Sequence, residues 1–279
     1  MTTDKEEDQA RPDWHTSAPH TYTREAWAWE FQRRNPDYRH ITTATIDEVG
    51  RKPHHSSKVL VVDPSDVANA ARAWGCLSFE PADRPANEAT VFWRPDVNPA
   101  VLPVTASPAR RDDEAFDIHR LASPTVVLRM ADGCEHVLLG DGLHRIQLEV
   151  RRGSLLDGPV RLSYELAGCD GIEPKLTALH RLLALQRLGH CPSSLYPPVQ
   201  RAQRWRMALQ ALDASHAGAS HREIASILWG DDVARTEWRS RSDYLRSRVR
   251  RTIHLGESMV KGGYLHLLQQ TQQRRAVTQ

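Results

Sequence analysis

The chain has 279 residues, of which 40% are hydrophobic, and its 37 lysines and arginines nearly balance its 35 acidic residues. This composition fits a globular protein of one large or a few small domains and excludes a chain that is disordered throughout. The near-neutral average excludes no anionic partner, because charge can gather locally. Residues 201–251 hold eleven arginines against six acidic residues.

The four cysteines stand far apart without a CxxC pair, which is typical of reduced thiols in a cytosol. Cys169, His180, His190 and Cys191 lack the spacing of a zinc site, so we expect no metal and no cofactor. No apolar run reaches the roughly 18 residues of a membrane span, and the N-terminus lacks a signal-peptide core. We therefore expect a cytoplasmic protein that has no membrane partner.

Residues 1–19 are predicted to form a disordered tail and residues 20–55 an aromatic helical domain. Trp27, Trp29 and Phe31 give a short helix that Asn35 and Pro36 stop, because proline cannot continue the hydrogen-bond ladder. A segment this small has no core of its own. It must dock on the rest of the chain, which we favour, or on a partner.

Residues 56–170 are predicted to be β-rich. The runs TVVLRM, EHVLL, LHRIQLEV and RLSYEL alternate aliphatic or β-branched residues and are separated by turns that contain Asp-Gly. Such turns need positive φ angles, which Gly and Asp tolerate, so the pattern predicts antiparallel hairpins in a small sheet. Upstream of these runs, PSDVANAARAWG predicts a short helix capped by Ser65.

Residues 171–272 have a helical pattern, and residues 273–279 form a second tail. In PKLTALHRLLALQRLG, the apolar stripe is Leu176, Leu179 and Leu183, and Gly189 ends the helix. We expect this helix to pack antiparallel to the next one in a compact all-helical bundle. The next helix has one apolar face that comprises Ala202, Trp205, Leu209 and Leu212.

A helix-turn-helix pattern follows. Ser220 and Glu223 form a capping box that opens a short helix, and a basic helix begins after Ser242. Eleven residues, DDVARTEWRSR, lie between Gly230 and Ser242, where the usual turn has three or four. Either the turn is extended or a small extra helix at about 233–238 lies inside it.

The basic helix SDYLRSRVRR has a buried edge and an arginine-rich remainder. Leu245, Val249 and Ile253 fall within about 80° of one another at helical spacing. Arg246 and Arg250 form an unfavourable like-charge pair four residues apart, which suggests an outside anion. We interpret the helix as a DNA contact, while a solvated or protein-binding basic face stays the alternative.

No catalytic site is predicted. His180, Arg181 and Tyr244 are residue types that a tyrosine recombinase uses, but no HxxR box accompanies them. No glycine-rich nucleotide motif follows a strand into a helix. The acid run at 112–114 has no metal-binding partners, so we do not expect an enzyme.

Both ends of the chain resemble known bacterial domains. AWEFQRRNPDYR resembles a small proteobacterial domain of unknown function, family 6499. ALHRLLALQRLG, SHREIASILWG, SDYLRSRVRR and GGYLHLL resemble family 2285, a variant helix-turn-helix domain. In this order the two domains resemble the FseA-type activators of integrative and conjugative elements, while the middle of the chain matches only loosely.

The resemblance implies an α+β protein that activates excision or conjugative transfer genes, with promoter DNA, RNA polymerase and a small antiactivator as partners. A protein-interaction module without DNA affinity is the alternative function, since related antiactivators do not bind DNA. The implied DNA-binding residues are Ser220, His221, Arg222, Arg239, Arg241, Tyr244, Arg246, Arg248, Arg250 and Arg251. The candidate protein-contact residues are Trp27, Trp29, Phe31, Arg33, Arg34 and Tyr38.

Overall fold

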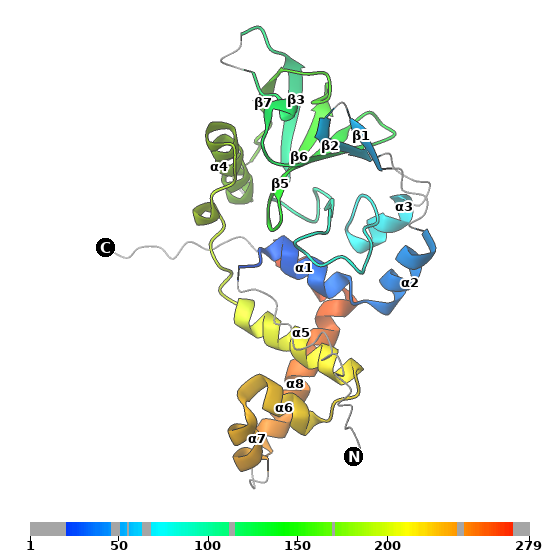
Figure 1. The fold of residues 1–279 in the computed structure, drawn as a ribbon, viewed down its shortest axis with the longest axis vertical. Coiled ribbons are helices and arrows are strands. Elements are labelled where there is room, and N and C mark those ends of the chain that lie inside the picture. The colour runs from blue at the N-terminus through cyan, green and yellow to red at the C-terminus, as the bar shows by residue number, and fades with distance from the viewer. Residues whose placement is uncertain are drawn as a thin grey trace, which may run out of the picture. The chain divides into compact units, whose positions relative to one another are not determined.

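The computed structural model divides the chain into two compact units (Figure 1). Among the described residues, the sheet unit comprises residues 21–198 and 260–269, and the helical unit comprises residues 199–259. The segment after residue 259 therefore returns to the unit in which the described chain begins. The described residues are 21–45, 51–54, 56–62, 68–111, 115–168, 171–238 and 243–269.

Two helices begin the sheet unit, α1 (Arg24–Gln32) and α2 (Pro36–Thr45). The predicted stop is confirmed, since α1 ends at Gln32. Pro36 also starts α2, because the first turn of a helix does not need the N–H that proline lacks. The Asn35 side chain caps this start, where its Oδ1 accepts hydrogen bonds from the backbone N–H groups of Asp37 and Tyr38 at 2.9 and 3.3 Å.

Seven strands of the described chain form one sheet in the order β1-β2-β4-β5-β6-β3-β7. The predicted hairpins β4-β5-β6 are confirmed as antiparallel pairs. The pairs β2-β4 and β3-β6 are parallel, so the sheet is mixed rather than wholly antiparallel. Long stretches of chain separate the strands of each parallel pair, and only long connections allow parallel pairing. The strands are β1 (Arg51–His54), β2 (Ser56–Val62), β3 (Leu102–Pro108), β4 (Thr125–Arg129), β5 (Glu135–Asp141), β6 (His144–Arg152) and β7 (Val160–Tyr164).

Helix α4 (Ile172–Leu188) packs on the sheet, and its buried residues are Ala178, Leu182 and Leu185. The predicted stripe Leu176, Leu179 and Leu183 is therefore wrong: Leu176 is 38% exposed, and only Leu179 of the three packs partly against this core. Leucines occur on several sides of this helix, so spacing alone does not determine which side the sheet covers. Helix α4 thus belongs to the sheet unit and the next helix to the helical unit, so the two do not form part of one compact bundle as predicted.

The opposite face of the sheet carries a second core, in which Leu128 and Leu138 meet Leu77 and Phe92. Leu77 follows the short helix α3 (Ala68–Ala71) and the 3-10 turn η3 (Arg72–Trp74). The predicted helix is thus present, while its proposed cap Ser65 lies outside the described residues. Two more 3-10 turns, η5 (Ile118–Arg120) and η6 (Ser193–Leu195), lie in connections of this unit.

Helix α9 (Leu265–Gln269) packs on α1, although the two are far apart in sequence. The buried Tyr264 hydroxyl donates a hydrogen bond to the Trp74 carbonyl oxygen at 3.0 Å. The Asn35 side-chain amide donates to the Val260 carbonyl oxygen at 3.1 Å. The compact helical unit is therefore shorter than the predicted domain 171–272, because α4 and α9 bury their apolar sides in the sheet unit.

The helical unit contains α5 (Ala202–His216), α6 (His221–Trp229), α7 (Asp231–Glu237) and α8 (Tyr244–Ser258). The predicted apolar face of α5 is confirmed as buried. Helix α7 confirms the extra-helix alternative for the long turn. A π-helical turn, η7 (Met259–Gly263), follows α8. Along the chain, helices come first and last and the strands lie between them, so the predicted α+β class is confirmed.

Candidate nucleic-acid interface

Helix α8 is fixed to the helical unit along one edge. Leu245, Val249 and Ile253 are buried and pack with residues of α5, α6 and α7. Gly256 continues this edge at a close crossing with α5, because a Cβ at Gly256 would lie 2.8 Å from the Ala208 carbonyl oxygen. The burial matches the spacing predicted from the sequence. The rest of the helix is left for solvent or a partner.

The arginines of α8 point in different directions from this edge. At about 100° per residue, Arg251 lies opposite Val249, while Arg250 and Arg248 lie about 100° away on either side. Arg246 lies only about 60° from Val249, close to the buried edge. The helix exposes Arg246, Arg250 and Arg251 and partly buries Arg248. The surface facing away from the unit is therefore formed by Arg248, Arg250 and Arg251 rather than by all four.

Arg248 is oriented by Trp229 at the end of α6. Its guanidinium carbon lies 4.4 Å from the centroid of the Trp229 ring, within the range of a cation–π contact. Such stacking leaves the edge of the guanidinium available for hydrogen bonds. Trp229 was not identified from the sequence. Its only sequence signal is an aromatic residue at the end of a capped helix that precedes a basic helix.

Two other arginines of α8 contact neighbours on the same helix or just before it. The Arg246 guanidinium forms an ion pair with the Asp243 carboxylate, with a Nε to Oδ1 distance of 2.6 Å. Arg250 donates a hydrogen bond from Nη2 to the Ser247 hydroxyl at 3.2 Å. Arg246 is thus partly neutralised within the protein, and Arg250 keeps its full charge beside a polar side chain.

The N-terminus of α6 is closed by the predicted capping box. The Ser220 hydroxyl accepts a hydrogen bond from the Glu223 backbone N–H at 3.3 Å, and the Glu223 carboxylate accepts one from the Ser220 N–H at 2.7 Å. Hydrogen bonds from the Ser220 side chain and from its backbone N–H lower the pKa of the Glu223 carboxyl, so it stays ionised. A phosphate approaching this helix end would meet that negative charge, although the His221 and Arg222 side chains are exposed beside it.

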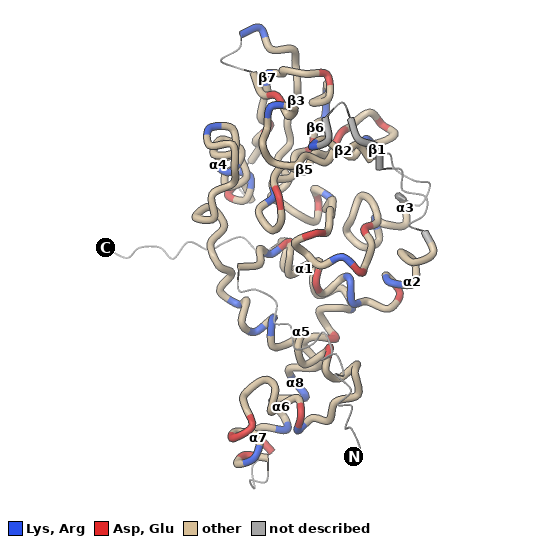
Figure 2. Tube along the Cα trace, viewed as in Figure 1, with Lys and Arg blue, Asp and Glu red and all other residues tan. Residues whose placement is uncertain are grey.

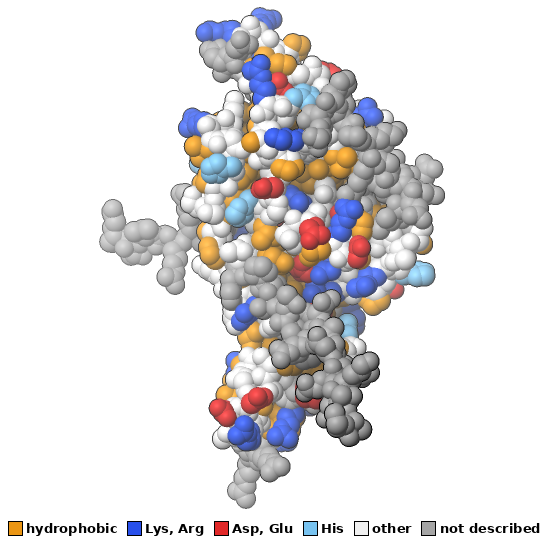
Figure 3. Space-filling view, in the orientation of Figure 1, with side chains coloured by type: hydrophobic (Ala, Val, Ile, Leu, Met, Phe, Trp, Pro, Cys, Tyr) orange, Lys and Arg blue, Asp and Glu red, His pale blue; other side chains and the backbone are white. Residues whose placement is uncertain are grey.

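Acidic side chains interrupt the basic surface of the helical unit. Asp231, Asp232 and Glu237 on α7 are exposed, and Asp232 lies 3.6 Å from Arg235. Figures 2 and 3 show basic and acidic residues close together on this unit. Exposed basic residues of this unit therefore lie on α8 and near the start of α6, and also at Arg201 and Arg204 at the start of α5. Tyr244, at the start of α8, is 58% exposed.

The structure brings together most of the predicted DNA-binding residues in the helical unit. Arg239 and Arg241 lie outside the described residues. The remaining predicted residues lie at the N-terminus of α6, Ser220, His221 and Arg222, and on α8, Tyr244, Arg246, Arg248, Arg250 and Arg251.

The candidate protein-contact residues of α1 and α2 are largely buried in the sheet unit. The exposed fractions of Trp27, Trp29, Phe31 and Tyr38 are 0, 1, 0 and 0%. Intramolecular docking is therefore what the structure shows, and these four rings offer no surface to a partner. Large aromatic side chains gain most when they leave water, and the core of the sheet unit accommodates these four, so they do not form a partner surface.

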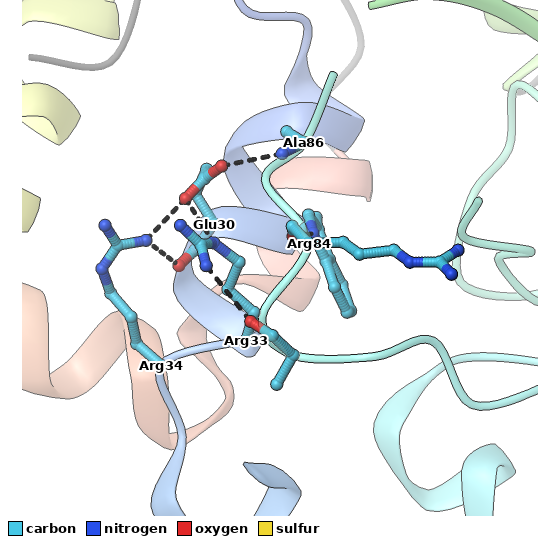
Figure 4. Close-up of polar contacts among 7 residues, drawn as sticks. Glu30, Arg33, Arg34, Arg84 and Ala86 are labelled. Carbon is cyan, nitrogen blue, oxygen red and sulfur yellow. Dashed lines mark hydrogen bonds and ion pairs between the residues drawn. The ribbon is translucent and has the colours of Figure 1, made fainter. Parts of the chain in front are cut away.

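Arg33 and Arg34, the other two predicted protein-contact residues, bind a carboxylate within the sheet unit (Figure 4). Both guanidinium groups bind the buried Glu30 carboxylate, with nitrogen to oxygen distances of 2.7 and 2.6 Å. The second Glu30 oxygen accepts a hydrogen bond from the Ala86 N–H at 2.9 Å. Burial raises the pKa of the Glu30 carboxyl, but the charges and hydrogen bonds of the two arginines outweigh it and lower the pKa below its ordinary value.

No helix in the described chain is long and apolar enough to cross a membrane. The described residues also contain no group of three or more His, Cys, Asp or Glu side chains that could hold a metal ion.

Two family models match the chain, one in its N-terminal part and one in its C-terminal part. Residues 11–80 match a proteobacterial transcriptional regulator-like domain. Residues 169–269, which include α6 and α8, match the DNA-binding domain of a T6SS transcription factor. No curated protein matches the chain significantly. Neither matched family is an enzyme family, and together the two matches support a DNA-binding transcription regulator.

Proposed function

We propose that the helical unit binds double-stranded promoter DNA through α8. The observation that carries this proposal is the distribution of side chains on α8. One edge of the helix is buried, and Arg248, Arg250 and Arg251 lie on its other sides. A helix held in this way can enter the major groove, which is wide enough for one α-helix. The family match over residues 169–269 supports the same assignment.

The arginines divide into three roles in this proposal. Arg251 and Arg250 reach the DNA directly, because both are exposed and have no acidic partner in the described chain. Arg248, stacked on Trp229, presents a fixed fork that suits a phosphate or a guanine edge. Arg246 contributes least, since Asp243 already neutralises part of its charge.

The α6 N-terminus plays a smaller part. His221 and Arg222 are exposed and can reach a phosphate from the first turn. Ser220 and Glu223 keep each other occupied in the capping box, so we assign Ser220 a structural role rather than a DNA contact. The positions Arg239 and Arg241, between α7 and α8 in sequence, are proposed to add phosphate contacts.

The regulated genes form a separate part of the proposal. The resemblance of both chain ends to FseA-type activators supports activation of excision and conjugative transfer genes, with RNA polymerase recruitment and control by a small antiactivator. The name of the family matched at residues 169–269 favours a second candidate, a role in type VI secretion gene expression. Chromatin immunoprecipitation with sequencing separates them by where the peaks fall, at integrase and transfer genes or at secretion genes.

A gel-shift assay tests the DNA contact itself. The DNA fragments are the promoters that the immunoprecipitation recovers, and the test variant carries Arg246, Arg248, Arg250 and Arg251 all changed to Ala. The control removes the same charge from the sheet unit by changing four exposed arginines, Arg110, Arg152, Arg161 and Arg187, to Ala.

We expect the control to shift DNA like the parent protein and the α8 variant to lose binding while it keeps its circular dichroism spectrum. Equal binding by the parent protein and the folded α8 variant would contradict the proposal. Absence of DNA binding by the parent protein itself, together with capture of a protein partner by the intact chain, would select the interaction-module alternative instead.

A further inference from the structure

The sheet unit contains a pocket that the DNA contact does not use. It lies where the first turns of α1 meet the β5-β6 hairpin, residues 86–100 and one side of α4. The space inside is about 660 Å³, part of it open to solvent. The site is therefore a cleft rather than a closed cavity, and clefts are among the places where small organic molecules bind.

Most of the pocket wall is apolar and rigid. Trp29 and Trp93 line it and are themselves held in place, because each is at most 3% exposed. The Trp29 indole N–H donates to the Arg84 carbonyl oxygen at 3.0 Å, and the Gln147 side chain forms two hydrogen bonds with the Trp93 backbone. Walls of this kind suit the apolar body of a ligand and do not need to rearrange to receive it.

Two arginines and one glutamate supply the charge of the lining, Arg145, Arg181 and Glu25. The described hydrogen bonds of both guanidinium groups go to backbone carbonyl oxygens rather than to carboxylates. Arg145 donates to the Ala89 carbonyl oxygen and, at 3.5 Å, to that of Asn87. Burial lowers the pKa of Arg145, while the more distant Glu80 and Asp141 carboxylates partly offset that effect.

Arg181 is the better placed of the two to meet a ligand. Its Nε donates to the Leu195 carbonyl oxygen at 3.1 Å, and its guanidinium carbon lies 3.9 Å from the Tyr196 ring centroid. The His144 ring stacks on the same Tyr196, with 4.4 Å between the centroids. These contacts fix the guanidinium plane. The terminal nitrogens of Arg181 make no hydrogen bond to a described residue, so both can donate to a carboxylate.

We propose that this pocket binds a small organic carboxylate with an apolar, ring-containing body. The carboxylate pairs with Arg181, and the body packs on the walls to which Trp29 and Trp93 contribute. The lining carries one positive charge in excess, which favours an anion over a neutral molecule of the same shape. This site belongs to the sheet unit and does not depend on the proposed DNA contact.

The test uses the full chain and two probes of equal shape. Indole-3-acetate carries a carboxylate, and indole-3-acetamide replaces it with a neutral amide. Both compete with the fluorescent anion 1-anilinonaphthalene-8-sulfonate, whose emission reports occupation of the pocket. We expect the carboxylate to displace the dye at a concentration about tenfold lower than the amide, as one charge-assisted hydrogen-bond pair would give.

Variants locate the effect. Arg181→Gln should abolish the preference for the carboxylate, and Arg181→Lys should retain part of it. Arg187→Gln, on the exposed side of the same helix, is the matched control and should change nothing. Glu25→Gln should strengthen carboxylate binding a few-fold, because it removes the negative charge from the lining. The Glu25→Gln variant keeps the test decisive if Arg181→Gln fails to fold.

Equal displacement by the two probes, no displacement by either, or a carboxylate preference that Arg181→Gln leaves intact would each overturn the proposal. DNA binding is measured on the same samples by gel shift. A protein that binds the carboxylate but no DNA would refute the proposed function and support the pocket proposal. A protein that binds DNA but shows no carboxylate preference would refute the pocket proposal and leave the proposed function standing.

Discussion

The sequences of α1 and α8 both predict a contact surface, yet the predicted contact residues are buried in α1 and largely exposed in α8. Helix α1 buries Trp27, Trp29 and Phe31 almost completely in the sheet unit. Helix α8 buries a single edge and leaves its arginines partly or fully exposed. The difference lies in the cost of leaving water. Aromatic rings gain from burial and become core, whereas unpaired guanidinium groups lose hydration and stay outside until an anion meets them.

The largest expected effect comes from breaking the α1 core. Trp29→Ala should lower the free energy of unfolding of the sheet unit by roughly 3–5 kcal/mol, because it removes a fully buried indole and leaves a cavity. Tyr244→Ala, at an exposed aromatic on α8, should cost less than about 0.5 kcal/mol. Chemical denaturation followed by tryptophan fluorescence measures both. Similar losses for the two variants would contradict the distinction between a core helix and a contact helix.

The next effect concerns the buried carboxylate of α1. Glu30→Gln should cost roughly 2–4 kcal/mol, because Arg33 and Arg34 would keep their charges next to a neutral amide. The Glu30 pKa is lowered in the folded protein from its ordinary 4.5. Its stabilisation is therefore fully present above the unfolded pKa and is lost as pH falls through the lower folded pKa.

A pH series of unfolding measurements checks this sign. The difference between the parent protein and Glu30→Gln should be constant near neutral pH and should shrink as the solution is acidified below about pH 4.5. Arg110→Gln is a suitable control, since it removes an exposed positive charge from the same unit. A difference that grows on acidification would show that Glu30 does not act as an ionised partner.

Sequence reasoning identified the elements better than their surroundings. Asp-Gly turns and strand periodicity locate β4, β5 and β6, because these signals act between neighbours in the chain. The buried face of α4 was predicted wrongly, because leucines lie on several sides of this helix and only packing against the sheet determines which side is buried. The return of α9 to α1 had no local signal at all, since the two helices are far apart in sequence.

The candidate site shows the same division. The buried edge of α8 and the capping box of α6 follow from spacing alone and were predicted. The pairing of Arg248 with Trp229 depends on how α6 and α8 pack. Spacing within one helix therefore indicates which residues are available, and tertiary packing decides which of them are oriented by a neighbouring helix.

The crossing of α5 and α8 gives a third, smaller effect. Gly256→Ala should destabilise the helical unit by about 1–3 kcal/mol, because the new methyl group would press on the Ala208 carbonyl and force α8 outward. Ser258→Ala, on the exposed side of the same helix, is the matched control. Thermal unfolding followed by circular dichroism compares them. An unchanged or raised melting temperature for Gly256→Ala would show that the crossing can relax.

The smallest effect distinguishes two arginines of α8 that both retain an exposed surface. Arg250→Gln should weaken binding to a recovered promoter fragment roughly tenfold, the value of one charged hydrogen bond. Arg246→Gln should weaken it by roughly threefold or less, because Asp243 already pairs with Arg246. Fluorescence anisotropy with labelled DNA gives both constants. A larger loss for Arg246→Gln would show that the ion pair with Asp243 does not limit the contribution of Arg246 to DNA binding.

The salt dependence of DNA binding tests the role of α8 most directly. We would measure the dissociation constant of the full chain for one recovered promoter fragment from 50 to 200 mM salt, roughly the range over which phosphate contacts dominate. The slope of log K against log salt should fall in magnitude by about 0.9 for each phosphate-contacting arginine lost, hence by up to about 2.7 for Arg248, Arg250 and Arg251 changed to Gln. A triple change of Arg110, Arg161 and Arg187 to Gln should keep the parent slope. Equal slopes and affinities for the parent protein and the α8 variant would contradict the assignment of α8 as the DNA-binding helix.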